Sequence, residues 1–317
     1  MRAIQIIEFG GPDVLLPATL PEPVVPTGHV GIAVDRAGVN YADTHQAENT
    51  YLQPATLPLV PGAEVVGRAD DGRRVVALVQ GGGYAERAVA PNALTYELPD
   101  AVGDGEALAL VLQGTTAWHL LRTCAHLAKR ESVVVHAGAG GVGSIAVQLA
   151  RLWGAGRVIA TASTPEKRAL AVQLGADIAI DPTADGLRDR ILDANGGESV
   201  DVVLEMTGGR VTDESLATLA PFGRLVFFGA AARELPRPVD PVALMAASRA
   251  VVGFWLAHCF TRPHLLAVAM EELLALTATS ELRPVVGGEY PLSEARRAHE
   301  DLRARATVGK LVLDPTC

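Results

Sequence analysis

The sequence predicts an α/β protein in two parts: a doubly wound parallel sheet of about six strands, and a barrel-like, mostly antiparallel β domain. Three observations lead to this prediction. Short β-type runs separated by turn residues fill the first hundred residues. Apolar strands then alternate with helical stretches as far as Leu256. A glycine-rich turn joins the first of these strands to its helix, in VVVHAGAGGVGSIAVQLAR (133–151).

The β domain is predicted from runs rich in β-branched residues. These are AIQIIEF, HVGIAVDRAGV, EVVGRA, RRVVALV and YAERAVA, separated by GGPD, DDGR and GGG. Runs of this length between turn residues are typical of antiparallel strands.

The second part begins near residue 112, where TTAWHLLRTCAHL has helical apolar spacing. The predicted strands are ESVVVHA, RVIATA, DIAID, VDVVLEM, RLVFFGA and AVVGFWL. Helices are predicted at Val142–Trp153, TPEKRALAVQLGA, GLRDRILDA and DESLATLA. Pro165 in the first turn and Gly175 just past the end support the second helix. Alternation of this kind predicts a parallel sheet with helices on both faces.

A helix, a strand, a second helix and a last strand are predicted after Leu256, in HLLAVAMEELLALTATS, PVVGGEYPL, LSEARRAHEDLRAR and VGKLVL. We expect this tail to return to the β domain. The length of 317 residues fits two domains. They are predicted as residues 1–115 with 257–317 (β-rich, catalytic) and residues 116–256 (dinucleotide-binding).

The composition excludes several classes of protein. Because the net charge is −9 and the pI is about 5.4, neither nucleic acid nor an anionic membrane is expected as the main partner. No apolar run reaches the ~18 residues of a membrane span. Cys124, Cys259 and Cys317 are too scattered for a disulfide framework or a cysteine-rich zinc site. A soluble, cytoplasmic protein fits best.

The turn Gly138-x-Gly140-x-x-Gly143 follows a predicted strand and opens a helix, which is the context that a dinucleotide-binding turn requires. Gly138 permits the tight turn, Gly140 lets the backbone approach a pyrophosphate, and Gly143 lets the helix pack closely on the sheet. The free N–H groups of the helix then face the phosphates. The expected contacts are Gly138, Ala139, Gly140, Gly141, Val142 and Gly143. His136 is interpreted as a hydrogen-bonded core histidine beneath this turn.

The residues after the next strand favour NADP(H) over NAD(H). A carboxylate about 20 positions after the glycine turn would bind the ribose of NAD. Ala162 lies 22 positions after Gly140, and the first carboxylate, Glu166, is already inside a helix. The hydroxyl and cationic groups there suit a 2′-phosphate instead; they belong to Ser163, Thr164, Lys167 and Arg168. The alternative is that Lys167 and Arg168 form an ordinary solvated helix face.

Six motifs, in order along the whole chain, resemble those of the medium-chain dehydrogenase/reductase superfamily, and specifically its zinc-free, zeta-crystallin-like NADPH:quinone oxidoreductase branch. They are GVNYAD (38–43), PGAEVVG (61–67), GGYAER (82–87), QGTTAW (113–118), AGAGGVG (137–143) and VGKLVL (308–313). The resemblance implies a Rossmann cofactor domain and a GroES-like catalytic domain.

The zinc-dependent members of that superfamily have metal ligands where this chain has Asn40, Ala63 and Gln113. None of these three is a normal zinc ligand, and the four-cysteine structural lobe is missing. A rebuilt site from Asp43, His45 and Glu64 would have ligand chemistry, but their spacing does not favour one. We therefore expect no metal.

Without a Lewis acid, a conjugated acceptor such as a quinone or an α,β-unsaturated carbonyl suits hydride transfer best. Its oxygen still needs hydrogen-bond donors. By resemblance, Asn40 and Tyr51 are the candidates near the nicotinamide of NADPH, and Tyr41 and Gln113 could add polar groups. For Tyr51, a plain packing role is the alternative.

The family pattern implies further cofactor contacts at Phe228, Gly229, Phe254, Leu256 and Lys310. For the two aromatic residues, core packing is the alternative. Relatives tend to dimerise through the last strand of the cofactor domain, here AVVGFWL. The loops AENTYLQPATLP and AHCFTRPHLL are expected to shape the pocket.

These observations predict an NADPH-dependent, zinc-free reductase. It would pass hydride to a small quinone or enone in a cleft between the two domains and would act as a homodimer. One alternative is an enoyl-thioester reductase of the same superfamily. The other is an NADPH-binding sensor or structural protein with little turnover.

Overall fold

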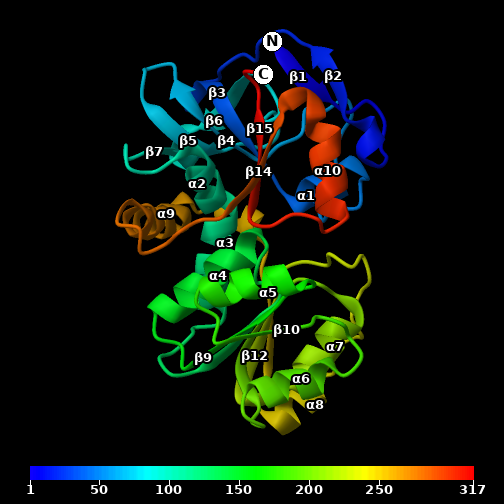
Figure 1. The fold of residues 1–317 in the computed structure, drawn as a ribbon. Coiled ribbons are helices and arrows are strands. Elements are labelled where there is room, and N and C mark those ends of the chain that lie inside the picture. Colours follow the sequence, from blue (N-terminus) through cyan, green and yellow to red (C-terminus); the bar gives the residue numbers. More distant parts are fainter. The chain divides into compact units, whose positions relative to one another are not determined.

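The computed structural model describes all 317 residues, which form two compact units. One unit consists of Met1–Thr115 and Cys259–Cys317, and the other of Thr116–His258. In the first unit, the two ends of the chain meet in one sheet, where the last strand lies beside an early one (Figure 1). No helix is long and apolar enough to cross a membrane.

The first unit is built on a seven-stranded sheet in the order β14-β15-β3-β4-β5-β7, with β6 also paired to β3. Every pairing is antiparallel except that of β14 with β15, so the predicted β domain is confirmed. The strands are β3 (His29–Val39), β4 (Glu64–Ala69), β5 (Arg74–Leu78), β6 (Arg87–Pro91), β7 (Thr95–Glu97), β14 (Val286–Pro291) and β15 (Lys310–Asp314). Outside this sheet, β1 (Arg2–Gln5) pairs with β2 (Leu16–Thr19), and an isolated antiparallel bridge links Ala3 of β1 to Ala85.

Of the helices of the first unit, α2 packs on the sheet, and α10 packs against α1 (Figure 1). They are α1 (Tyr41–Ala47), α2 (Asp104–Leu108), α9 (Pro263–Ala278) and α10 (Ala295–Arg303). Alternate residues of the strands, such as Ile32, Val34 and Val65, lie in one apolar core. Short 3₁₀ turns occupy Pro12–Val14, Asn92–Leu94 and Leu292–Glu294.

The second unit contains a six-stranded, fully parallel sheet in the order β10-β9-β8-β11-β12-β13, as predicted. The strands are β8 (Ser132–Val135), β9 (Arg157–Thr161), β10 (Ile178–Ile180), β11 (Val200–Glu205), β12 (Leu219–Phe227) and β13 (Ala250–Gly253). The helices are α4 (Gly141–Leu152), α5 (Pro165–Gln173), α6 (Leu187–Ala194), α7 (Gly209–Ala217) and α8 (Pro241–Ala247). The chain reverses its direction of travel across the sheet between β8 and β11. The carboxyl ends of those two strands are where doubly wound sheets bind ligands.

The structure adds α1, α2 and α8, which were not predicted, and two of the predicted helices begin at other residues. The helix expected at 115–127 is part of a longer one in which α2 continues through wide π turns at Ala109–Gly114, α3 (Thr115–His119) and π turns at Leu120–Cys124. The helix expected at 213–220 begins earlier, at Gly209, and ends at Ala217. Its earlier start follows from Glu205, whose carboxylate accepts hydrogen bonds from Gly208 N (3.1 Å) and Thr212 Oγ1 (2.5 Å). A single turn, Leu256–Cys259, leads out of the unit.

Candidate active site

Asn40 lies in the first unit, at the junction where β3 ends and α1 begins. Its backbone N–H donates to Asp43 Oδ2 at 2.9 Å. This hydrogen bond is one half of a capping box: a carboxylate on the third residue of the helix accepts the N–H of the residue just before the helix and so stabilises its start. The residue is only 4% exposed, so its side chain must find its partners inside the protein.

The Asn40 amide is the centre of a buried polar cluster, which we call the Asn40 cluster: Asn40, Glu64, Gln113 and Lys310. Asn40 Nδ2 donates to Glu64 Oε1 at 2.9 Å. Asn40 Oδ1 accepts from Gln113 Nε2 at 3.1 Å and from Lys310 Nζ at 3.0 Å. The structure thus brings together two of the predicted catalytic residues, Asn40 and Gln113.

Lys310 and Glu64 form an ion pair whose two side chains are 0% exposed. Lys310 Nζ also donates to Val39 O at 3.3 Å. All the recorded partners of the ammonium, Val39, Asn40 and Glu64, therefore lie in the protein interior. Two acceptors of the cluster, Glu64 Oε2 and Gln113 Oε1, are buried without a hydrogen-bond partner.

Gly38 makes room for this pair. A Cβ at this position would overlap Glu64 Oε1 and would lie 2.7 Å from Lys310 Cε. Carbon atoms do not approach one another that closely, so any side chain at position 38 would displace the ion pair.

A second buried network joins α1 to α10 and was not foreseen from the sequence. Tyr84 Oη donates to Asp43 Oδ2 at 2.8 Å and lies 3.0 Å from His299 Nε2. Burial raises the pKa of Asp43 to about 6, and it lowers the pKa of His299 to about 4. Burial and the neighbouring Asp43 carboxylate raise the pKa of Tyr84 well above its usual value. His299 lies 215 residues from Tyr84 in the chain, so no local pattern indicates their contact.

Tyr51, the third predicted catalytic residue, lies in the loop after α1, half-buried. Its ring is 6.4 Å from that of His45, which in turn meets Tyr41 edge-on at 5.5 Å. The structure therefore places Tyr51 beside this aromatic pair.

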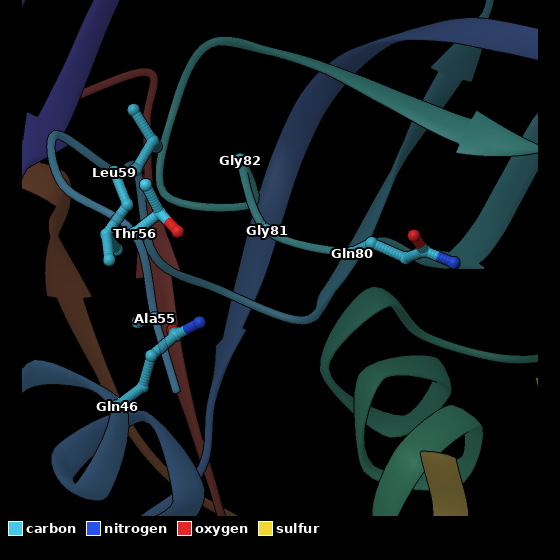
Figure 2. A pocket seen from close by; sticks show the side chains of 8 residues that line it. Gln46, Ala55, Thr56, Leu59, Gln80, Gly81 and Gly82 are labelled. Atoms are coloured by element: carbon cyan, nitrogen blue, oxygen red, sulfur yellow. The ribbon is translucent and has the colours of Figure 1, made fainter. Parts of the chain in front are cut away.

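An open hollow of about 370 Å³ lies in the first unit. Gln46 reaches it from α1, Thr56 and Leu59 from the segment before β4, and Gln80 from the segment after β5 (Figure 2). Ala55 and Thr56 belong to the loop 47–58 that was expected to shape a pocket. The lining combines amide and hydroxyl groups with small apolar ones.

The glycine turn lies in the second unit, between β8 and α4. A Cβ at Gly138 would lie 2.7 Å from Ala160 Cβ, and one at Gly143 would overlap Ala137 O. Gly140 precedes α4 and no side chain caps it. The first N–H groups of α4, at Gly141, Val142 and Gly143, therefore have no partner within the helix and can receive phosphate oxygens.

His136 sits beneath this turn. Its Nδ1 lies 3.1 Å from Thr161 Oγ1 and its Nε2 lies 2.8 Å from Ser215 Oγ. Burial lowers its pKa, so the ring is neutral near pH 7. The interpretation of His136 as a hydrogen-bonded core residue is confirmed.

The residues predicted to bind the 2′-phosphate lie just after the end of β9. Ser163 is exposed, and Thr164 Oγ1 accepts from Lys167 N at 3.3 Å, which caps α5. Arg168 Nη1 donates to Ala162 O at 3.0 Å and lies 3.5 Å from Asp181. Its Nε and Nη2 have no protein partner, so two donors remain for an anion.

The other predicted cofactor contacts also belong to the second unit. Phe228 and Gly229 follow β12 directly and are half-buried, with Phe228 N donating to Glu205 O at 3.0 Å. Phe254 stacks on His119 with ring centroids 5.7 Å apart, and Leu256 is buried. Phe254 thus has a packing role, whatever its part in cofactor binding.

Asp43 and His299 have opposite effects on stability between pH 4 and pH 6. The folded pKa of Asp43 lies above its unfolded value, so its contribution is full below the unfolded pKa and is lost as pH rises through about 6. The folded pKa of His299 lies below its unfolded value, so its contribution is present above that value and is lost as pH falls toward about 4. In the wild-type protein the two effects largely cancel.

Each effect should emerge when the other group is removed. Asn at position 43 keeps an acceptor for the backbone of Asn40. For Asp43→Asn we expect a free energy of unfolding about 2 kcal/mol lower at pH 5 than at pH 7, because only His299 still titrates. For His299→Leu we expect the opposite sign, with a value about 1 kcal/mol higher at pH 5. Guanidinium unfolding at both pH values measures this, and equal pH dependence in the two variants would contradict it.

Comparison with known proteins shows the family of this chain. Residues 141–275 match the zinc-binding dehydrogenase family. The quinone oxidoreductase of Lama guanicoe is 34% identical over 99% of this chain and 97% of its own. That of Pseudomonas aeruginosa is 33% identical over 99% of both chains.

Two solved structures have the same fold. The quinone oxidoreductase of Thermus thermophilus, also determined with NADPH, has a TM-score of 0.89 and 39% identity, over 99% of this chain and 100% of its own. The Escherichia coli enzyme complexed with NADPH has a TM-score of 0.92 and 30% identity over the same shares. The chain belongs to the quinone oxidoreductase branch of the medium-chain dehydrogenase/reductase superfamily and is an oxidoreductase.

Proposed function

We propose that this protein transfers hydride from NADPH to a quinone or another small conjugated carbonyl without a metal ion. The Asn40 cluster carries the proposal, because its two amides, Asn40 and Gln113, stand at positions where zinc-dependent relatives are expected to have metal ligands, and the Lys310 ammonium lies beside Asn40. The NADPH complexes of the Thermus thermophilus and Escherichia coli relatives support the choice of cofactor.

The residues present do not fit the zinc that the matched family's name implies. Asn40 and Gln113 offer amides, and Ala63 offers no ligand atom. The Lys310 ammonium lies 3.0 Å from Asn40 Oδ1 and would repel a divalent cation at the same place. No group of three or more His, Cys, Asp or Glu side chains is arranged to hold a metal.

The residues of the glycine turn do fit a dinucleotide. Gly138 and Gly143 let the turn pack tightly, because a Cβ at either position would clash with Ala160 or Ala137. The first N–H groups of α4 offer donors to a pyrophosphate. Arg168, with two unpartnered nitrogens, would hold the 2′-phosphate of NADPH. When bound, NADPH supplies the hydride.

In this proposal the protein stabilises the charge that develops on the acceptor. As hydride adds to a conjugated carbonyl, negative charge gathers on its oxygen, which the Asn40 amide can receive by donating a hydrogen bond. Tyr51 is retained as a second candidate donor. A hydroquinone anion is weakly basic enough to take its proton from water, so no dedicated general acid is required.

The direct test follows NADPH oxidation near ~340 nm with a benzoquinone, an aliphatic enone and a crotonyl thioester in parallel. We expect turnover with the quinone, and a change of less than about twofold after EDTA treatment, because no step uses a metal. Loss of activity on chelation would contradict zinc independence. Turnover of the thioester alone would indicate an enoyl reductase, and binding without turnover a sensor.

Arg168→Ala should reduce the preference for NADPH. Loss of a charge-assisted contact to the 2′-phosphate should lower kcat/KM for NADPH by about 10- to 100-fold and leave the value for NADH within about twofold. Arg188→Ala, on the exposed face of α6, is the matched control and should leave both values unchanged. Equal losses for both cofactors in Arg168→Ala would rule out a phosphate contact.

We further propose that two copies pair along β13. This strand is the edge of the parallel sheet, and β12 is its only partner. Phe254 N donates to Phe227 O, so by strand alternation the N–H of Gly253 points outward. An outward row of N–H and C=O groups invites pairing with another strand.

Light scattering should give about twice the monomer mass of 33.1 kDa. Gly253→Pro removes the outward N–H and should shift the protein toward monomer. Gly253→Ala is the control, because a Cβ there meets nothing within 4 Å. A wild-type monomer, or a Gly253→Pro dimer as stable as the wild type, would refute this pairing.

A further inference from the structure

The partners of Asn40 determine which way its amide faces. A lysine ammonium can only donate hydrogen bonds, and a carboxylate can only accept them. Lys310 therefore requires the oxygen of Asn40 on its side, and Glu64 requires the nitrogen on the other. Gln113 Nε2 adds a second donor to the same oxygen. A flipped amide would set its nitrogen against the ammonium and its oxygen against the carboxylate.

This orientation leaves one hydrogen of Asn40 Nδ2 without an acceptor in the protein. The first is donated to Glu64 Oε1, and no other acceptor is within reach. The oxygen, by contrast, already accepts from both Gln113 and Lys310. What Asn40 has left to offer a bound molecule is thus an N–H.

The ion pair is a costly way to build a core. Removing two charges from water costs several kcal/mol per ion, and a pair of apolar side chains of similar size is often as stable or more so. Here the cost is greater still, because Glu64 Oε2 is buried with no partner. Gly38 must also stay without a side chain to accommodate the pair. Stability alone does not account for this arrangement.

We propose that Lys310 and Glu64 are positioning residues that hold the Asn40 amide with its N–H available for the substrate oxygen. This inference rests on the proposed function and adds a selectivity rule to it. A site fixed in this way favours acceptors whose oxygen gains negative charge during hydride transfer, and it disfavours a hydroxyl that must donate its proton to the same point.

The variant that separates positioning from packing is Glu64→Gln with Lys310→Met. It removes both charges with little change in volume, so neither charge is left buried and unpaired. Gln at position 64 can donate or accept, and Met at position 310 cannot donate. The residues at positions 64 and 310 then no longer determine the orientation of the Asn40 amide.

We expect kcat with the quinone to fall by about 10- to 100-fold in this double variant, because the donor to the developing oxyanion is no longer fixed. The KM for NADPH and the thermal midpoint should stay close to those of the wild type. Arg74→Met with Asp104→Asn is the matched control. It removes an ion pair of the same unit that does not touch Asn40, and it should leave kcat unchanged.

A mutant cycle adds a readout that a merely structural role would not move. If the pair acts through Asn40, the same double change made in an Asn40→Ala background should lower kcat by no more than about twofold further. A folded double variant with wild-type kcat, or full additivity with Asn40→Ala, would overturn the inference. A wild-type protein that reduces no conjugated acceptor would instead refute the proposed function.

Discussion

The first unit depends on one buried charge pair, Glu64 with Lys310. Lys310 begins the last strand and Glu64 begins β4, and β3 lies between them in the sheet. The two side chains meet beside the end of β3, next to Asn40, so the pair ties the last strand to β4 and fixes the residue between them. Buried charges tolerate little displacement, because each loses its opposite charge when the other moves. The strands that hold this pair therefore also fix the position of the Asn40 amide.

The two units carry candidate binding residues of different kinds. The glycine turn works through backbone geometry: close approach at Gly143 and free N–H groups at the start of α4. The Asn40 cluster works through side chains whose donors and acceptors must match in pairs. The glycine turn needs glycine only at the positions where a Cβ has no room, whereas the Asn40 cluster needs a specific polar side chain at each of its four positions.

What the sequence could predict was local in the chain. The glycine turn, its strand and its helix are adjacent, and strand–helix alternation extends over the second unit, so that the fold class and strand count could be read from periodicity. The contacts of His299 with Tyr84 and of Lys310 with Glu64 join residues 215 and 246 positions apart, and one sequence holds no record of such distances. The earlier start of α7 was missed because Glu205, a strand residue, supplies its cap. The π turns near Gln113 keep the apolar spacing of an ordinary helix, so the sequence gave no signal that distinguished them from one.

Gly38 also bears on how this site can change over time. While the ion pair is present, position 38 has no room for a side chain, and a ligand introduced at position 40 would lie beside the Lys310 ammonium. If the pair positions the Asn40 amide as proposed, a substitution that made room for a metal ion there would also release that amide. A methyl group at position 38 would disturb the same pair, so the absence of one Cβ helps to keep the site as it is.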